Sequence, residues 1–97
     1  MATFVSLINW TEQGISNFRD TPKRADAFTQ MISKYGGSVK DLYWTLGPYD
    51  IVAVVEAPDD ETMTAAALEL GSLGNVRTTT LRAFGRTEIE TIIKKTG

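Results

Sequence analysis

One short apolar run, Ile51 to Val55, places the strongest restriction on how this chain can fold. It reads Ile-Val-Ala-Val-Val, with Gly47-Pro48 before it and Pro58 after it. A short run rich in β-branched residues, bounded by turn residues, is typical of a strand buried on both faces in the middle of a sheet. Because residues 39–46 form another strand candidate just before the turn, the two segments predict a β-hairpin.

Two further strands are predicted at the ends of the chain. Ala2 to Trp10 carries apolar residues at both odd and even positions, which again suggests an internal strand. The fourth candidate spans residues 75–84, where three consecutive threonines favour extended backbone. Arg77 and Arg82 make this segment more polar than the others, so we expect it at the edge of the sheet.

Three helices are predicted between and after the strands. The first begins at Thr21-Pro22, with Thr21 as its N-cap, and carries an apolar stripe at spacings of three and four as far as Tyr35. The second is opened by the segment Pro58 to Glu61, which supplies an Asp as N-cap and acidic residues for the first turn. A short C-terminal helix follows Gly85, where Thr87 to Glu90 fits a capping box. Residues 11–20 are mostly polar and are predicted to form a loop.

The resulting order is β-α-β-β-α-β followed by a short helix. Short connections and right-handed crossovers then favour an α+β, ferredoxin-like fold, an antiparallel sheet with its helices on one face. In that topology the first and third strands are central. These are the two strands whose sequences are apolar on both faces, so the local and global predictions agree.

The two-sided apolar character of the central strands predicts a homodimer. Helices on one side of the sheet cannot cover both Phe4 and Val5, or both Ile51 and Val52, because neighbouring strand residues point to opposite faces. A second copy of the chain would cover the other face economically. The alternative is a monomer that leaves a few Val and Leu side chains in water, which folded proteins tolerate.

The amino-acid composition further restricts which partners and which kinds of site we expect. The 97 residues fit a single domain spanning 1–97, with net charge −2 and scattered Lys and Arg, so we expect neither nucleic acid nor membrane as a partner. Cysteine and histidine are both absent. Their absence removes disulfides, thiolate metal sites and the commonest general base, and we therefore expect no cofactor and no metal. Since no signal segment or membrane-length apolar run is present, a cytoplasmic location is expected.

The sequence resembles the GYD-domain family, named for a Gly, a Tyr and an Asp that stand here as Gly47, Tyr49 and Asp50. The resemblance extends to residues 11–15, 21–24, 51–60 and 74–80. It implies a dimeric α+β barrel, in which two ferredoxin-like sheets pack face to face. The wider fold includes cofactor-free monooxygenases, muconolactone-type isomerases, haem-degrading enzymes and effector-sensing domains. No established activity comes with the GYD family itself, and fold alone does not choose among these chemistries.

Tyr49 and Asp50 have two interpretations. A tyrosine beside a carboxylate is capable of proton transfer. Yet adjacent strand residues point to opposite faces, so both side chains reach one pocket only if the strand bulges. The structural interpretation is favoured: residues 47–50 form the turn and Asp50 accepts hydrogen bonds from backbone N–H groups.

Aromatic and polar strand residues supply the other candidates for a ligand site. Trp10, Trp44 and Tyr43, with Phe4, are candidates for an aromatic pocket between sheet and helices or within the barrel. They serve equally well as core or dimer filling. Asn9 and Arg82 are candidates to fix the polar end of a small organic ligand. The alternative for Asn9 is that it simply ends a strand, and the alternative for Arg82 is that it lies on an exposed sheet edge.

Three functional classes follow from these residues. The one favoured is a homodimeric module that binds or senses a small molecule, because no histidine, cysteine or evident acid–base pair is present. The others are a cofactor-independent isomerase or monooxygenase acting on an aromatic or enol substrate, and a purely structural or assembly protein. Whether the chain is an enzyme is left open by the sequence.

Overall fold

The computed structural model describes all of residues 1–97 and contains four strands and four α-helices. The strands are β1 (Ala2–Trp10), β2 (Ser38–Trp44), β3 (Ile51–Ala57) and β4 (Val76–Ala83). The helices are α1 (Glu12–Ser16), α2 (Thr21–Lys34), α3 (Asp60–Ser72) and α4 (Arg86–Lys94), with a single 3₁₀ turn at Phe18–Asp20. The expected β-α-β-β-α-β order is therefore present.

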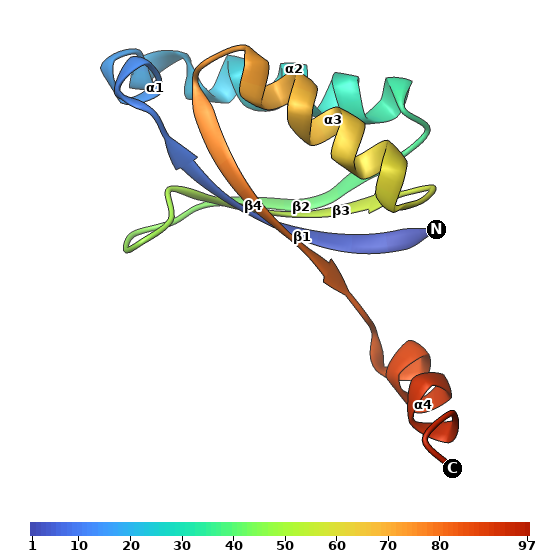
Figure 1. Cartoon of the computed structure of the whole chain (residues 1–97). Coiled ribbons are helices and arrows are strands. Elements are labelled where there is room, and N and C mark those ends of the chain that lie inside the picture. Colours follow the sequence, from blue (N-terminus) through green and yellow to red (C-terminus); the bar gives the residue numbers. More distant parts are fainter.

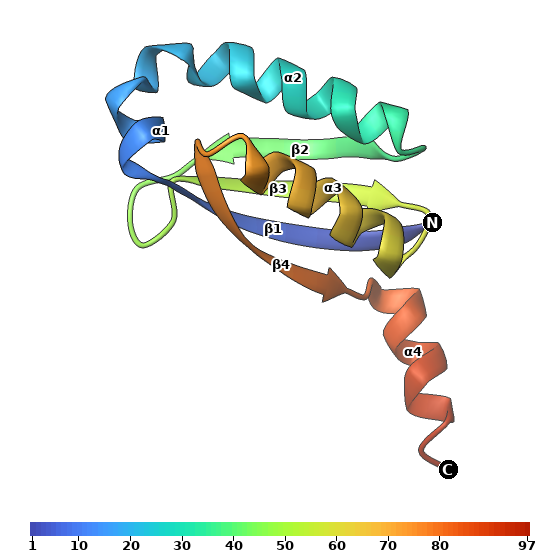
Figure 2. The same cartoon turned by 45° about the horizontal axis from the view of Figure 1, so that its top comes forward.

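The four strands form one antiparallel sheet in the order β2-β3-β1-β4. The central pair is β1 and β3, and β4 is an edge strand, as the sequence predicted. Figure 1 and Figure 2 show α2 and α3 side by side on one face of this sheet, with the opposite face left open. The predicted ferredoxin-like fold is confirmed.

The core lies between the sheet and the helical layer, and strand alternation determines which residues enter it. Phe4 and Ile8 of β1 and Val55 of β3 are buried, while every second residue between them is only half-buried. From the helices, Ile32 of α2 and Met63 of α3 complete the centre of the core. The apolar stripes at helical spacing therefore bury against the strand residues that share one face.

Residues 11–20 differ from the expected loop, because they form α1 and the 3₁₀ turn. The Thr11 side chain caps α1 by accepting a hydrogen bond from the N–H of Gly14 at 3.1 Å. Gly14 is buried because α1 packs tightly against the backbone of Asn75. A cap and a close tertiary contact thus stabilise a helix of five residues that its polar sequence did not indicate.

Two helix starts also differ slightly from prediction. Thr21 is the first residue of α2 rather than its N-cap, a position that Asp20 occupies. At α4 the cap is Gly85, not Thr87, and the Glu88 carboxylate accepts the Gly85 N–H at 3.1 Å. The predicted cap at α3 is confirmed: Asp59 accepts the N–H of Thr62, and hydrogen bonding from Thr62 lowers the pKa of the Asp59 carboxyl.

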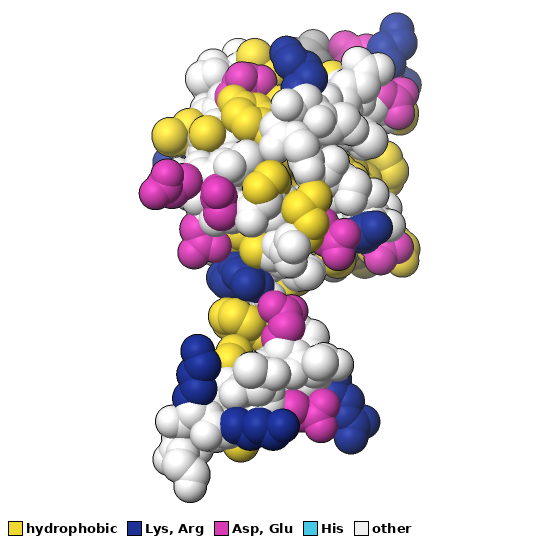
Figure 3. Space-filling view, turned by 90° about the vertical axis from the view of Figure 1, so that its right-hand side faces the viewer, with side chains coloured by type: hydrophobic (Ala, Val, Ile, Leu, Met, Phe, Trp, Pro, Cys, Tyr) yellow, Lys and Arg dark blue, Asp and Glu magenta, His cyan; other side chains and the backbone are white.

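The C-terminal helix α4 stands apart from the rest of the domain. Figure 1 shows it projecting beyond the end of β4, and in the space-filling view it is joined to the body through a narrow neck (Figure 3). Ile89 and Ile93 of this helix are exposed. A nine-residue helix is marginal on its own in water, so α4 depends on contacts at its base or with another chain.

The open face of the sheet is apolar at its centre. Strand register places Val5 beside Val54 and Leu7 beside Val52, and β4 extends the first pair with Leu81. These side chains are half-buried or exposed, and no helix covers them. We call this set (Val5, Leu7, Val52, Val54 and Leu81) the open sheet face. None of the helices is both long enough and apolar enough to cross a membrane.

Candidate functional site

The turn that contains Asp50 is fastened to the end of β1. The Asp50 carboxylate accepts the backbone N–H of Trp10 at 2.9 Å, and the Asp50 N–H donates to the carbonyl of Ile8 at 2.9 Å. Its own carbonyl accepts the N–H of Thr45 at 2.8 Å. Asp50 thus joins β1 to the β2–β3 hairpin, and its carboxylate accepts from the neighbouring strand rather than from its own turn.

Two side chains donate hydrogen bonds to backbone carbonyls in the rest of this turn. The Asn9 side-chain nitrogen donates to the carbonyl of Pro48 at 2.7 Å, and the Thr45 hydroxyl donates to the carbonyl of Tyr49 at 2.6 Å. Gly47 has φ +128°, a conformation that residues with a side chain rarely adopt. The Gly, Tyr and Asp of this turn therefore lie in a tightly specified backbone junction.

The two aromatic residues near the end of β2 point to opposite faces of the sheet. The Trp44 indole N–H donates to the hydroxyl of Thr21 at 3.0 Å and so lies on the helical side, where the side chain is 46% exposed. Tyr43 stands opposite Val52 at the margin of the open sheet face and is 60% exposed. The two rings therefore do not share a pocket.

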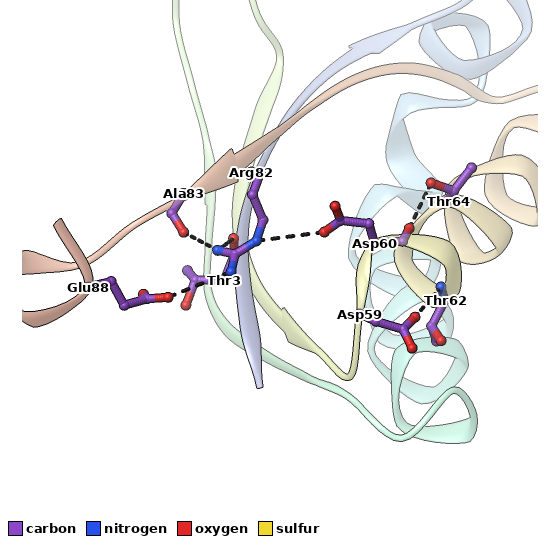
Figure 4. A network of polar contacts seen from close by, with 8 residues as sticks. All are labelled: Thr3, Asp59, Asp60, Thr62, Thr64, Arg82, Ala83 and Glu88. Carbon is purple, nitrogen blue, oxygen red and sulfur yellow. Dashed lines mark hydrogen bonds and ion pairs between the residues drawn. The ribbon is translucent and has the colours of Figure 1, made fainter. Parts of the chain in front are cut away.

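Arg82 lies at the other end of the sheet, on the helical side, and links three elements (Figure 4). Its guanidinium is 3.6 Å from carboxylate oxygens of Asp60, which opens α3, and of Glu88 in α4. It also donates to the backbone carbonyls of Thr3 and Ala83, and its carbon atom lies 4.5 Å from the ring centre of Phe84. These contacts assign Arg82 a role in fixing the start of α4.

A cavity of about 210 Å³ lies within the helical layer, between α2, α3 and the sheet. Of its fifteen lining residues eleven are hydrophobic, so an apolar molecule would be favoured there. It reaches the surface, since Ala27, Glu69 and Leu73 on its wall are exposed. The buried part is lined by side chains from four elements: Ile8 and Trp10 of β1, Phe28 and Met31 of α2, Ile51 of β3 and Val76 of β4.

One residue that lines the cavity has a buried polar atom without a partner. The indole nitrogen of Trp10 is buried and makes no hydrogen bond, in contrast to that of Trp44. Arg24 lines the same cavity and donates to the carbonyls of Asn17 and Gly14 at 2.9 and 3.1 Å. It forms no ion pair with any carboxylate of the chain. The cavity therefore combines an apolar wall with two charged side chains, Arg24 and Glu69.

Of the residues that the sequence suggested for a ligand site, Trp10 alone lines this cavity. Asn9, Tyr49 and Asp50 lie at the nearby hairpin junction. Trp44 and Tyr43 lie on opposite faces of the sheet. Arg82 lies at the far end of the sheet, beside a second, more open cavity of about 380 Å³. Sequence reasoning missed Arg24, which stands one position before the apolar stripe of α2. Its place at the margin of that stripe was the available signal.

The match to known families is extensive. The GYD domain family matches residues 4–93, which is most of the chain. This chain is a GYD-domain protein. The resemblance seen at Gly47, Tyr49 and Asp50 is thereby confirmed.

A relative and two solved structures are similar to this GYD domain. The "Glutamine synthetase and cystathionine beta-lyase binding protein" of Thermus thermophilus is 40% identical over 85 residues, covering 87% of this chain and 90% of the relative. The crystal structure of TTHA0845, also from Thermus thermophilus, has a TM-score of 0.57 at 31% identity, covering 88% and 95%. MtbAldR has a TM-score of 0.62 at 20% identity, covering 88% of this chain and 53% of that one, and it supports the fold alone.

The Asp50 carboxylate yields the first prediction. Replacing Asp50 with Ala leaves the Trp10 N–H without its acceptor, so we expect the free energy of unfolding to fall by about 1–2 kcal/mol. Asp50→Asn retains a side-chain oxygen and should lose less than half of that. Urea unfolding followed by circular dichroism measures both. Equal losses for the two variants would show that the carboxylate charge matters, not the hydrogen bond.

Proposed function

We propose that this GYD domain is a homodimeric binding module that holds a small organic molecule, and that it does not act as an enzyme. The observation that carries the proposal is the cavity of about 210 Å³, eleven of whose fifteen lining residues are hydrophobic. Its one carboxylate, Glu69, lies at the exposed rim and accepts the Tyr35 hydroxyl at 3.0 Å. Such a site is suited to binding, because no acid–base pair faces its interior.

The open sheet face supports the homodimeric part of the proposal. Its five apolar side chains form a continuous patch across three neighbouring strands, and helices cover only the other side. Charged residues flank the patch: Lys40 and Glu56 form an ion pair at 3.3 Å near one edge. An apolar centre with a polar rim is the usual composition of a protein interface. Two copies packed face to face would make the barrel expected for this family.

Protein partners are the second part of the proposal. The relative that is 40% identical is named for binding glutamine synthetase and cystathionine β-lyase. We infer that the outer surface of this homodimer likewise contacts enzymes, with the small molecule tuning that contact. Leu68 of α3 and Leu73 at the C-terminal end of this helix are exposed, and Leu73 also lines the cavity. This surface is suited to such a contact.

The experiment is biolayer interferometry with glutamine synthetase and cystathionine β-lyase from the chain's own source organism. We expect saturable binding to at least one of them, weakened several-fold by Leu73→Glu at the cavity mouth. A matched control is Leu46→Glu, which alters a fully exposed leucine in the hairpin loop. Absence of saturable binding to both enzymes would refute the enzyme-binding part of the proposal.

A further inference from the structure

We propose that helix α4 is an arm whose apolar face packs against the partner protomer of the homodimer. The inference rests on the proposed homodimer and names a further part of its interface. The occupant is a second copy of this chain, seated on the side of the sheet that carries the open sheet face. A chain that dimerises without using the arm and a chain that does not dimerise are distinct results.

The sequence of α4 contains an apolar stripe that its own chain does not cover. Ile89, Ile92 and Ile93 recur at spacings of three and four, so they share one face of the helix. Ile89 is 41% exposed and Ile93 is 57% exposed, and no residue of α4 is buried. We call these three residues the isoleucine stripe. A monomer leaves this stripe in water.

The polar contacts that fix α4 to the sheet lie at its first turn. The Glu88 carboxylate accepts the Gly85 N–H at 3.1 Å and lies 3.6 Å from the Arg82 guanidinium. Figure 3 shows the helix joined to the body of the domain through a narrow neck. A helix of nine residues held at one end is marginal in water. Packing of the isoleucine stripe against another surface would supply the missing stabilisation.

The position of α4 selects the partner protomer as that surface. In Figure 1, α2 and α3 lie above the sheet, whereas α4 lies below its level, beyond the end of β4, and Figure 2 also places it away from α2 and α3. The side below the sheet is that of the open sheet face. Leu81, a member of that face, is separated from the start of α4 by residues 82–85 alone. A second copy packed on the open sheet face therefore lies on the same side as α4.

The limited apolar area of the open sheet face also favours a second contact. Val5, Leu7, Val52 and Val54 are already half-buried in the isolated chain, so a partner can bury only part of their surface. A stable interface usually buries about 800 Å² on each partner. The isoleucine stripe adds apolar side chains that are more exposed. Two-fold symmetry would add this contribution twice, because each copy gives one arm and receives one.

Sedimentation equilibrium of two matched full-length variants tests the arm. Ile93→Gln removes an apolar side chain from the isoleucine stripe, whereas Thr91→Gln alters the opposite face of α4, and neither changes the net charge. Because each substitution occurs twice in the dimer, we expect Ile93→Gln to raise the dimer dissociation constant at least about tenfold. Thr91→Gln should leave it within about twofold of that of the unaltered chain, as is usual for a surface substitution.

Isotope-filtered NMR on a mixture of ¹³C-labelled and unlabelled chains detects the contact directly. We expect nuclear Overhauser effects from the methyl groups of Ile89 and Ile93 to protons of the unlabelled chain, since these signals arise only between two copies. Hydrogen exchange gives an independent readout. The amides of α4 should exchange faster when the unaltered chain is diluted below its dimer dissociation constant, because the helix then loses its packing surface.

Three outcomes would overturn the proposal. A dimer with equal dissociation constants in the two variants and no intermolecular signal from the isoleucine stripe would refute the arm and leave the homodimer standing. A chain that is monomeric at every concentration would refute both. If Ile93→Gln weakened binding to glutamine synthetase but not dimer formation, the stripe would belong to an enzyme interface instead. Should Ile93→Gln fail to fold, as judged by circular dichroism, the intermolecular signals of the unaltered chain decide.

Discussion

A Val52→Asp variant of this GYD domain is expected to lose the proposed homodimer while keeping its fold. Val52 lies on the open sheet face between Leu7 and Tyr43, and it is half-buried in the isolated chain, so a carboxylate there remains hydrated in a monomer. In a two-fold interface the substitution appears twice and buries two like charges. The dimer dissociation constant should rise at least about 100-fold, because an unpaired buried charge costs ~3 kcal/mol or more.

The control for this prediction is Leu68→Asp. Leu68 of α3 is 71% exposed and lies on the helical layer, away from the open sheet face, so the same change in charge should leave the dimer intact. Size-exclusion chromatography with light scattering reports the mass of both variants, and circular dichroism reports their fold. A Val52→Asp protein that remains dimeric at the concentrations where the unaltered chain is dimeric would contradict the assigned interface.

Among the glycine-to-alanine substitutions possible in this chain, Gly14→Ala is expected to destabilise the fold most. A Cβ atom at Gly14 would overlap the carbonyl oxygen of Asn75 and press on its carbonyl carbon, so either α1 or the start of β4 must move. That movement threatens the hydrogen bonds from Thr11, which donates to Asn75 through its N–H and to Gly74 through its hydroxyl. We expect a loss of about 2–4 kcal/mol in unfolding free energy, measured by urea denaturation.

Gly71→Ala provides a control with the opposite sign. Gly71 lies in α3 with a helical backbone, and a Cβ atom there would meet nothing within 4 Å. Because alanine restricts the unfolded chain and suits a helix, we expect a gain of about 0.5–1 kcal/mol. Similar small effects for both glycines would refute the tight packing of α1 against the segment before β4.

The sheet was predictable from sequence because two simple signals agreed. The β-branched run from Ile51 and the two-sided pattern of Ala2 to Trp10 marked the central strands, and Arg77 and Arg82 marked the edge. The helical stripe of α2 and the Asp59 cap of α3 were equally local signals. Each depends on the period of side chains along one element, which a single sequence records.

What the sequence did not predict depends on contacts between distant segments. Helix α1 is fixed by Asn75, sixty-one residues beyond Gly14, and no local pattern reveals that approach. Likewise the hydrogen bond from Trp10 to Asp50 crosses between strands that only the sheet register brings together. The cavity arises because α2 and α3 leave space above Ile8 and Ile51, a matter of helix placement rather than of side-chain period.

The aromatic candidates illustrate the same limit. Trp10 and Trp44 are both predicted as possible pocket residues, yet one indole has a partner in Thr21 and the other has none. Sequence assigns both the same chemistry, whereas the structure separates a residue that anchors α2 from one that lacks an acceptor. Helical periodicity likewise places Arg24 on the solvent side of α2, at the margin of the apolar stripe, whereas in the structure it lines the cavity and donates to the carbonyl of Gly14.

Sedimentation equilibrium of the unaltered chain at micromolar concentration tests the central claim, that the open sheet face pairs with a second copy. The protomer mass is 10.7 kDa. We predict a single species of twice that mass across the concentration range, because burial of five apolar side chains from each copy favours association. A folded, concentration-independent species of 10.7 kDa would contradict the claim and leave the open sheet face as an exposed surface.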